Sequence, residues 1–382
     1  MGVASDCIAA WRAASTGVVA KTAQTREKYW KHWARYASVC GVDPFLQDVP
    51  PIEQDIIVTA FAARVRTGHY GRGLPITVSG VTSALAAISK TIKLAGQQSP
   101  IYRGDQKYTL AIERMVEGFR REDPPSTPQL AVPVTVPHNC YSAGLLSQDP
   151  QILASGCLAT IAFYFLLRVG EYTQPKWVIR NGKKIRATRT VQFEVGHIGF
   201  FKNGKILPRS SPLTTLLTSD SATLKITNQK NGRMGETVHQ RATNKVGCPV
   251  QALARRVHHI LSNGGTTKNL IGDYFANDKW ASVTSKDMIS LVRASVKALK
   301  LHENGIDADL VGSHSLRAGG AMAMKLHKHP DTTIKKMGRW SSLTFLQYIH
   351  TQIAHLSDTI SKDMSIPLPF LNIASIEGHT SA

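Results

Sequence analysis

The sequence predicts a mainly α-helical protein with a small antiparallel β-sheet, divided into two domains. Three observations support this prediction. The 382 residues exceed an ordinary domain of about 100–200 residues. Apolar residues recur every three or four positions through much of the chain, as in amphipathic helices. Near its middle, short alternating runs are broken by Asn-Gly pairs, which is typical of hairpins.

The first part of the chain predicts a small all-helical module. Within 25–39, Tyr29, Trp30, Trp33 and Tyr36 recur at helical spacing, with basic residues on the flanks. Further helical patterns cover 56–65, 78–94 and 110–119, and turns containing Gly and Pro separate them. Taken alone, this segment also fits a purely structural helix bundle.

A proline-rich stretch predicts the domain boundary. It begins at Glu122-Asp123-Pro124-Pro125 and extends to Pro133 and Pro137, and such a stretch cannot continue a helix. We therefore place a helical domain at 1–123, a semi-rigid linker at 124–137, a second domain at 138–356 and a C-terminal tail at 357–382.

The second domain is predicted to be helical with one small sheet. Residues 152–167 predict a helix that is apolar on nearly every face. Strands are expected at 191–195, 198–201, 224–226 and 237–239, with turns at Asn203-Gly204 and Asn231-Gly232. Helices return at 250–261, after Pro249 in the first turn, and after the capping box Thr284-Ser-Lys-Asp287.

The charge balance indicates a polyanionic partner. The chain has 46 Lys and Arg against 26 Asp and Glu, a formal net charge of +20. An excess of this size in a globular chain points most often to nucleic acid. No run approaches the roughly 18–20 apolar residues of a membrane span, and no secretion signal is evident. The five cysteines are widely spaced, so we expect reduced thiols in an intracellular protein.

Arg168 is the first candidate site residue. It ends an almost wholly apolar segment, Phe163-Tyr-Phe-Leu-Leu167, where a charge needs a partner. That partner is either Glu171, three residues further on, or a phosphate oxygen, which suits the planar guanidinium. From this segment alone the salt bridge is favoured, because such pairs are common.

A second candidate is the stretch Gly312-Ser-His314-Ser-Leu-Arg317. If a helix begins near Ser313 or Ser315, His314 and Arg317 lie at its positive end and project to one side, which favours an anion. The alternative is a capped structural helix with an incidental histidine. Gly319 and Gly320 weaken this helix, so we expect it to pack closely against another backbone.

A third candidate is Gly338-Arg-Trp340-Ser-Ser-Leu-Thr-Phe-Leu-Gln-Tyr348. We expect Gly338 to end one short helix, Trp340 to lie in the turn, and a new helix to start at Ser341 or Ser342. Tyr348 would then lie beside the apolar stripe of that helix. An isolated aromatic residue at this spacing is usually part of a core.

In chain order, these candidates resemble the tyrosine recombinase (lambda-integrase) family, and the phrase around Trp340 is most similar to the recombinases of crypton and DIRS-like mobile elements. The resemblance implies a two-domain DNA clamp, with a core-binding, SAM-like domain and a tyrosine recombinase catalytic domain. One departure is the Trp340-to-Tyr348 spacing of eight residues, where the best-known members have nine.

The resemblance also implies roles for these residues. Arg168, Arg317 and His314 would bind the scissile phosphate, Glu171 would support Arg168, and Trp340 would donate a hydrogen bond to the phosphate. Tyr348 would be the nucleophile. A hairpin lysine would be the general acid, either Lys230, which precedes the Asn-Gly turn, or Lys225 on the strand. A solvated basic residue is the alternative for either lysine.

The implied reaction is DNA strand cleavage and rejoining through a 3′-phosphotyrosyl intermediate, without metal, ATP or another cofactor. Double-stranded DNA would be the partner, and a homo-tetramer on two sites would exchange its C-terminal segment, with 366–373 as the candidate. Localisation would be nuclear in a eukaryotic host. Relaxation of supercoiled DNA in the manner of a type IB topoisomerase, and DNA binding without catalysis, are the alternatives.

Overall fold

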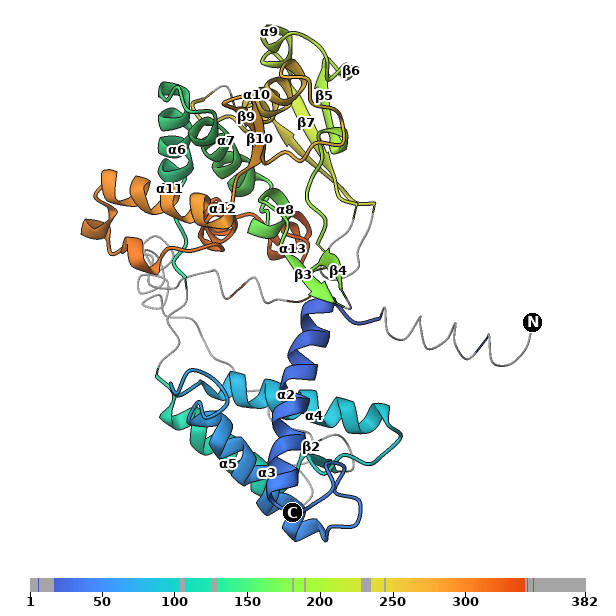
Figure 1. The fold of residues 1–382 in the computed structure, drawn as a ribbon. Helices are drawn as coiled ribbons and strands as arrows, with labels where there is room; N and C mark the ends of the chain where they lie inside the picture. Colours follow the sequence, from blue (N-terminus) through green and yellow to red (C-terminus); the bar gives the residue numbers. More distant parts are fainter. Residues whose placement is uncertain are drawn as a thin grey trace, which may run out of the picture. The chain divides into compact units, whose positions relative to one another are not determined.

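The computed structural model describes residues 6, 17–103, 107–124, 129–180, 182–188, 190–227, 235–243, 245–340, 342 and 346. The chain forms two compact units, 1–127 with 175–189, and 128–174 with 190–382. Each unit has its own apolar core. The described chain is mainly helical with small antiparallel sheets, which confirms that part of the predicted fold class (Figure 1).

The first unit contains the helices predicted for the N-terminal part. Trp33 and Phe61 are fully buried between them, and the indole N–H of Trp33 donates to Pro44 O at 2.8 Å. A short hairpin, β1–β2, precedes the last helix. The elements are α2 (Ala20–Val39), α3 (Pro51–Arg66), α4 (Val78–Leu94), β1 (Tyr102–Arg103), β2 (Lys107–Tyr108) and α5 (Leu110–Glu122).

A second hairpin joins this unit from further along the chain. Strands β3 (Trp177–Arg180) and β4 (Lys183–Arg186) pair in antiparallel register. The amide of Gln24 on α2 donates to Ile179 O at 3.0 Å, and the Lys21 N–H donates to Ala187 O at 3.3 Å. Residues 175–189 therefore group with the first unit, although they fall inside the segment 138–356 predicted as the second domain.

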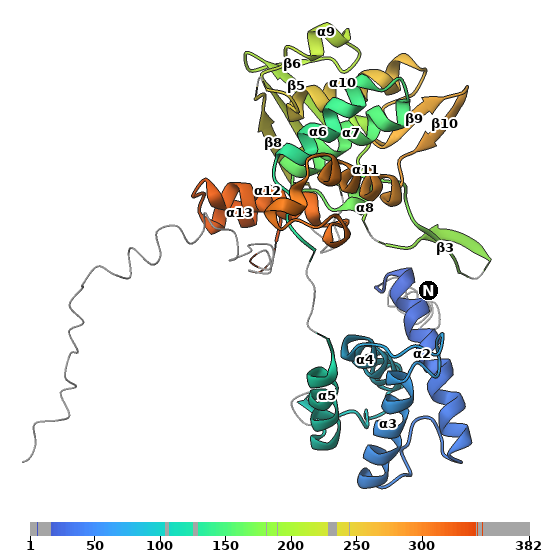
Figure 2. The ribbon, with the colours of Figure 1, turned by 90° about the vertical axis from the view of Figure 1, so that its left-hand side faces the viewer.

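Helix α7 (Pro150–Tyr164) forms the middle of the second unit. Residues 154–163 are all buried, as expected of a helix apolar on nearly every face. Figure 2 shows α6 beside it, and α7 also contacts α10, α11, α12 and β9. The remaining helices are α6 (Thr135–Leu146), α8 (Val169–Tyr172), α9 (Leu213–Leu216), α10 (Pro249–Ser262), α11 (Ser285–Ala298), α12 (Ser315–Leu326) and α13 (Asp331–Met337).

The predicted sheet is present, with order β6-β5-β7-β8. The Asn203-Gly204 pair forms the β5–β6 turn with both φ angles positive, as predicted. The Asn231-Gly232 turn lies outside the described residues. The strands are β5 (Ile198–Lys202), β6 (Lys205–Leu207), β7 (Ser221–Lys225) and β8 (Thr237–Arg241), and a separate hairpin pairs β9 (Asp273–Ala276) with β10 (Lys279–Ser282).

Two sequence-based expectations differ from the structure. Residues 191–195 were expected to form a strand, but Phe193 donates to Glu171 O while its own carbonyl accepts from Ile271 N–H, so its backbone bonds join two different segments. Part of the expected linker belongs to the second unit: Leu130 N–H donates to Leu310 O, and Pro137 is tolerated in the first turn of α6.

Candidate functional site

Arg168 lies at a sharp turn between α7 and α8. Leu166 has φ 49°, a left-handed conformation, and Arg168 is the N-cap residue of α8. Its backbone N–H donates to Glu171 Oε2 at 2.9 Å, and its Nη1 donates to Oε1 at 3.1 Å. The Arg168 side chain is 23% exposed and that of Glu171 only 2%. The predicted salt bridge between Arg168 and Glu171 is thus present.

Arg317 reaches the same turn from α12, which begins at Ser315 as predicted. Its Nη1 donates to Leu166 O at 2.9 Å and its Nη2 donates to Gly338 O, and the residue is buried. The close helix packing expected from Gly319 and Gly320 is confirmed: a Cβ at these positions would overlap the carbonyl oxygens of Val132 and Phe163. The glycines bring α12 close enough for Arg317 to reach the turn.

Trp340 packs against Arg317 from a third segment. Gly338 ends α13, as predicted, and a Cβ there would overlap the Trp340 ring. The guanidinium carbon of Arg317 lies 4.4 Å from the centre of that ring, which is a cation–π contact. Arg317 is therefore fixed by two backbone carbonyls and one aromatic face.

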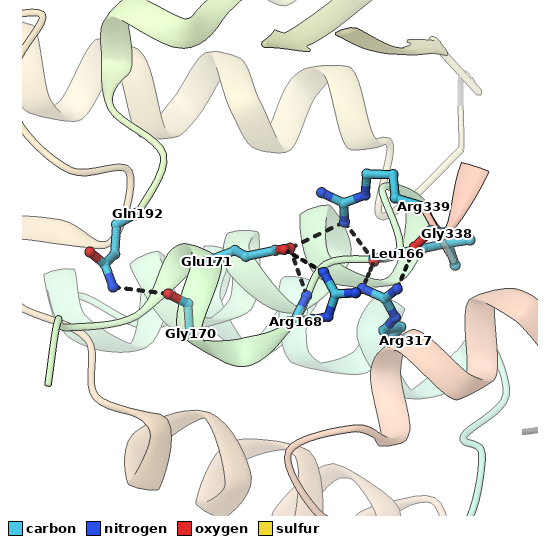
Figure 3. Close-up of polar contacts among 8 residues, drawn as sticks. All are labelled: Leu166, Arg168, Gly170, Glu171, Gln192, Arg317, Gly338 and Arg339. Atoms are coloured by element: carbon cyan, nitrogen blue, oxygen red, sulfur yellow. Dashed lines mark hydrogen bonds and ion pairs between the residues drawn. The ribbon is translucent and has the colours of Figure 1, made fainter. Parts of the chain in front are cut away.

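Arg339 is a member of this cluster that the sequence analysis missed. It is only 1% exposed, and its Nη2 donates to Leu166 O at 3.0 Å and to Glu171 Oε2 at 3.1 Å. Figure 3 shows the three guanidinium groups gathered around Glu171 and the Leu166 carbonyl. The sequence did offer one signal, because Arg339 is a charged residue between Gly338, expected to end a helix, and the candidate Trp340.

The electrostatics of the cluster favour an ionised Glu171. Burial by itself raises the pKa of this carboxyl, but the positive charges of Arg339, Arg317 and Arg168 outweigh that effect and hold its pKa below the ordinary 4.5. Burial lowers the pKa of Arg339, and the Glu171 carboxylate partly offsets this. One carboxylate thus faces three guanidinium groups.

The other predicted site residues are placed less completely. His314 is exposed and is the N-cap residue of α12, and its backbone N–H donates to Gln129 Oε1 at 3.0 Å. Lys225 is exposed at the end of β7. Lys230 and Tyr348 lie outside the described residues. The Glu236 carboxylate, directly before β8, acts to raise the pKa of Arg339, which burial lowers.

Fixed guanidinium groups suit an anion, and among these three the Arg168 side chain is 23% exposed, whereas Arg317 and Arg339 are buried. In the part of the chain that the structure describes, His, Cys, Asp and Glu side chains form no group of three suited to a metal ion. Within the same residues, no helix has the length and apolar character needed to cross a membrane. Cys40, Cys140, Cys157 and Cys248, the cysteines among them, are free thiols.

No protein-family model and no curated protein matches the sequence. Several solved structures are similar to this chain. The XerH site-specific recombinase, in a post-cleavage complex with a palindromic difH substrate, has a TM-score of 0.47 and 13% identity, over 80% of this chain and 71% of that chain. The Tn1549 transposon integrase with transposon right end DNA has a TM-score of 0.42 and 10% identity, over 82% and 85%. XerA recombinase has a TM-score of 0.36 and 12% identity, over 88% and 98%.

Proposed function

We propose that this protein is a site-specific DNA recombinase of a mobile element that cuts and rejoins DNA strands through a covalent 3′-phosphotyrosyl intermediate. The observation that carries the proposal is the convergence of Arg168 and Arg317 on one turn. Arg168 reaches Glu171 there, and Arg317 reaches the Leu166 carbonyl. Two arginines fixed in this way fit a reaction whose transition state accumulates negative charge on a phosphate.

The proposed chemistry needs no external energy source. The Tyr348 oxygen attacks phosphorus and forms a phosphotyrosyl bond, while the bond from phosphorus to the 5′ oxygen breaks. His314 takes the proton from the phenol, and Lys230, or Lys225 in its place, gives a proton to the leaving 5′ oxygen. The new ester conserves the bond energy, so a 5′ hydroxyl from another strand can reverse the step. Arg168 and Arg317 hold the non-bridging oxygens throughout.

The charge of the chain fits a duplex DNA partner. A net charge of +20 favours phosphate contacts, which position a protein on DNA without reading the sequence. We further propose a homo-tetramer on two DNA sites, in which the segment 357–382 passes to a neighbouring subunit, and action in the nucleus of a eukaryotic host.

The test is the capture of the covalent intermediate. The protein is incubated with nicked suicide duplexes from the ends of the DNA element that carries its gene, and denaturing gels detect a protein–DNA adduct. We expect an adduct with the wild type and none with Tyr348→Phe, because phenylalanine lacks the attacking oxygen.

Each other outcome has a distinct meaning. An adduct that persists in Tyr348→Phe would place the nucleophile elsewhere. Tight binding without an adduct on the protein's own sites would favour DNA binding without catalysis. Relaxation of supercoiled plasmid without a recombinant product would assign a type IB topoisomerase-like activity instead.

A further inference from the structure

The backbone conformation and the burial of Arg339 are both energetically unfavourable. It has φ 58°, in the left-handed region that non-glycine residues seldom adopt, and its side chain is almost fully buried. The backbone conformation has a local cause, because Arg339 N–H donates to Lys336 O at the end of α13. The burial of a charge has no such local cause.

Stability does not explain this arginine. Its Nε and Nη1 are buried and have no hydrogen-bond partner among the residues that the structure describes. Buried donors without acceptors are unfavourable, and a buried ion pair seldom stabilises more than an apolar side chain of similar size.

The two bonds that Arg339 does make go to the acceptors that hold the other arginines. Its Nη2 donates to Glu171 Oε2, and Glu171 binds Arg168 through Oε1. The same Nη2 donates to Leu166 O, which also accepts from Arg317 Nη1. As Figure 3 shows, Arg339 is the one labelled side chain that contacts both acceptors.

We infer that Arg339 is a positioning residue, which fixes the Glu171 carboxylate and the Leu166 carbonyl so that Arg168 and Arg317 are held in the geometry that an anionic phosphate requires. This inference rests on the proposed strand-cleavage function. It assigns Arg339 an effect on the chemical step, transmitted through Glu171 and Leu166, rather than a contact with DNA.

Arg256 provides a matched control in the same unit. It too is 1% exposed, its guanidinium donates to the backbone carbonyls of Ile271 and Asp273, and its Nη1 has no partner among the described residues. These hydrogen bonds go to the segment before β9 and to β9 itself, not to Glu171 or Leu166. The variants Arg339→Lys and Arg256→Lys therefore each remove a guanidinium group and keep the positive charge. The two sites are equally buried, and one lies inside the cluster and the other outside it.

The experiment measures single-turnover adduct formation on saturating suicide duplex, the Kd for the same duplex, and the melting temperature. For Arg339→Lys we expect the adduct rate to fall by about 100-fold, because small displacements of positioning groups have effects of this size. The Kd should stay within about threefold, since DNA affinity comes mainly from many phosphate contacts. Arg256→Lys should lower the melting temperature to a similar degree and keep the adduct rate within about threefold, measured where both variants are folded.

A double-mutant cycle tests the route through Glu171. If Arg339 acts through this carboxylate, Arg339→Lys should slow a Glu171→Gln protein far less than it slows the wild type. Independent, multiplying effects of the two changes would overturn the inference. So would equal losses of rate in the Arg339 and Arg256 variants.

A second readout needs no catalysis. Nitrogen-15 spectra of the arginine side chains should show the Arg168 and Arg317 Nε–H signals shifted or broadened in Arg339→Lys and unchanged in Arg256→Lys. Unchanged signals in both variants would overturn the positioning role. A wild type that forms no adduct while these signals do respond would contradict the proposed function alone.

Discussion

At the scale of single residues, the buried arginine cluster depends on the Glu171 carboxylate. Its two oxygens accept from the Arg168 side chain, the Arg168 backbone and the Arg339 side chain, at 2.9–3.1 Å. Removing one partner from a buried charged network is more damaging than replacing the whole network, because the remaining charges stay buried without compensation. Glu171 is therefore the member whose charge the folded state needs most.

We expect Glu171→Gln to reduce the free energy of unfolding of the second unit by about 3–5 kcal/mol, because it leaves buried guanidinium groups without their shared carboxylate. Urea denaturation followed by tryptophan fluorescence measures this loss. Glu303→Gln, at an exposed position of the same unit, should change stability by less than about 0.5 kcal/mol. Equal effects of the two changes would mean that the cluster contributes nothing beyond ordinary surface charge.

The same carboxylate predicts a pH dependence. Because its folded pKa lies below the ordinary 4.5, the folded state binds fewer protons than the unfolded state in the acid range. The stabilisation is complete above the ordinary pKa and is lost as the pH falls through the lower folded value. The difference in melting temperature between wild type and Glu171→Gln should therefore narrow as the pH falls from 7 to 3, and a constant difference would contradict this.

At the scale of elements, the approach of α12 to α7 positions Arg317. We expect Gly320→Ala to destabilise the second unit by about 1–3 kcal/mol, since the added methyl group would overlap Phe163 O and forces the helices apart. Gly118→Ala is the control, because that glycine lies in α5 with open space around it, and it should stabilise the first unit by about 0.5–1 kcal/mol. Thermal denaturation of both variants separates close packing from helix propensity.

Elements with a strong local signal could be predicted from the sequence. The apolar period of 78–94 gives α4 with its observed bounds, and the capping box at Thr284 forms as expected before α11. The hairpin β3–β4 escaped prediction because Lys183, Lys184 and Arg186 hide the alternating pattern. Hairpin β9–β10 turns at Asn277-Asp278, both with positive φ, a less familiar pair than Asn-Gly.

The residues of the candidate site likewise divide into those that a local pattern predicts and those that only the fold brings together. Arg168 with Glu171 could be predicted because residues three positions apart are neighbours where a helix begins. Arg339 could not, because its acceptors, Leu166 and Glu171, lie far away in the sequence and only the fold brings them together. The sequence pattern indicated Gly338 and Trp340 on either side of it, but nothing in a local pattern shows that the residue between them is buried.

At the scale of the whole molecule, positive charge is the dominant property. Residues 1–125 carry 16 Lys and Arg against 11 Asp and Glu, a net +5, and the rest of the chain carries 30 against 15, a net +15. Residues 175–189, which group with the first unit, add six Lys and Arg and no Asp or Glu, so the first unit has a net charge of +11 and the second +9. Both the charge and its spread over two units favour many weak phosphate contacts rather than a few strong ones.

We therefore expect duplex affinity to fall steeply with salt. Each neutralised phosphate contributes about −0.9 to the slope of log K against log salt concentration, so contacts from both units predict a slope of about −5 or steeper. Fluorescence anisotropy with a labelled duplex between 50 and 300 mM KCl measures it, and a slope near zero would show that the charge serves another purpose. Lys183 and Lys184 are both exposed on β4, and the Lys184 ammonium lies 5.4 Å from the centre of the Trp177 ring on β3. If this hairpin contacts the backbone, the double change Lys183→Gln with Lys184→Gln should make the slope shallower by about 2. An unchanged slope would confine the phosphate contacts to the rest of the surface, since a lysine that neutralises no phosphate releases no counterion.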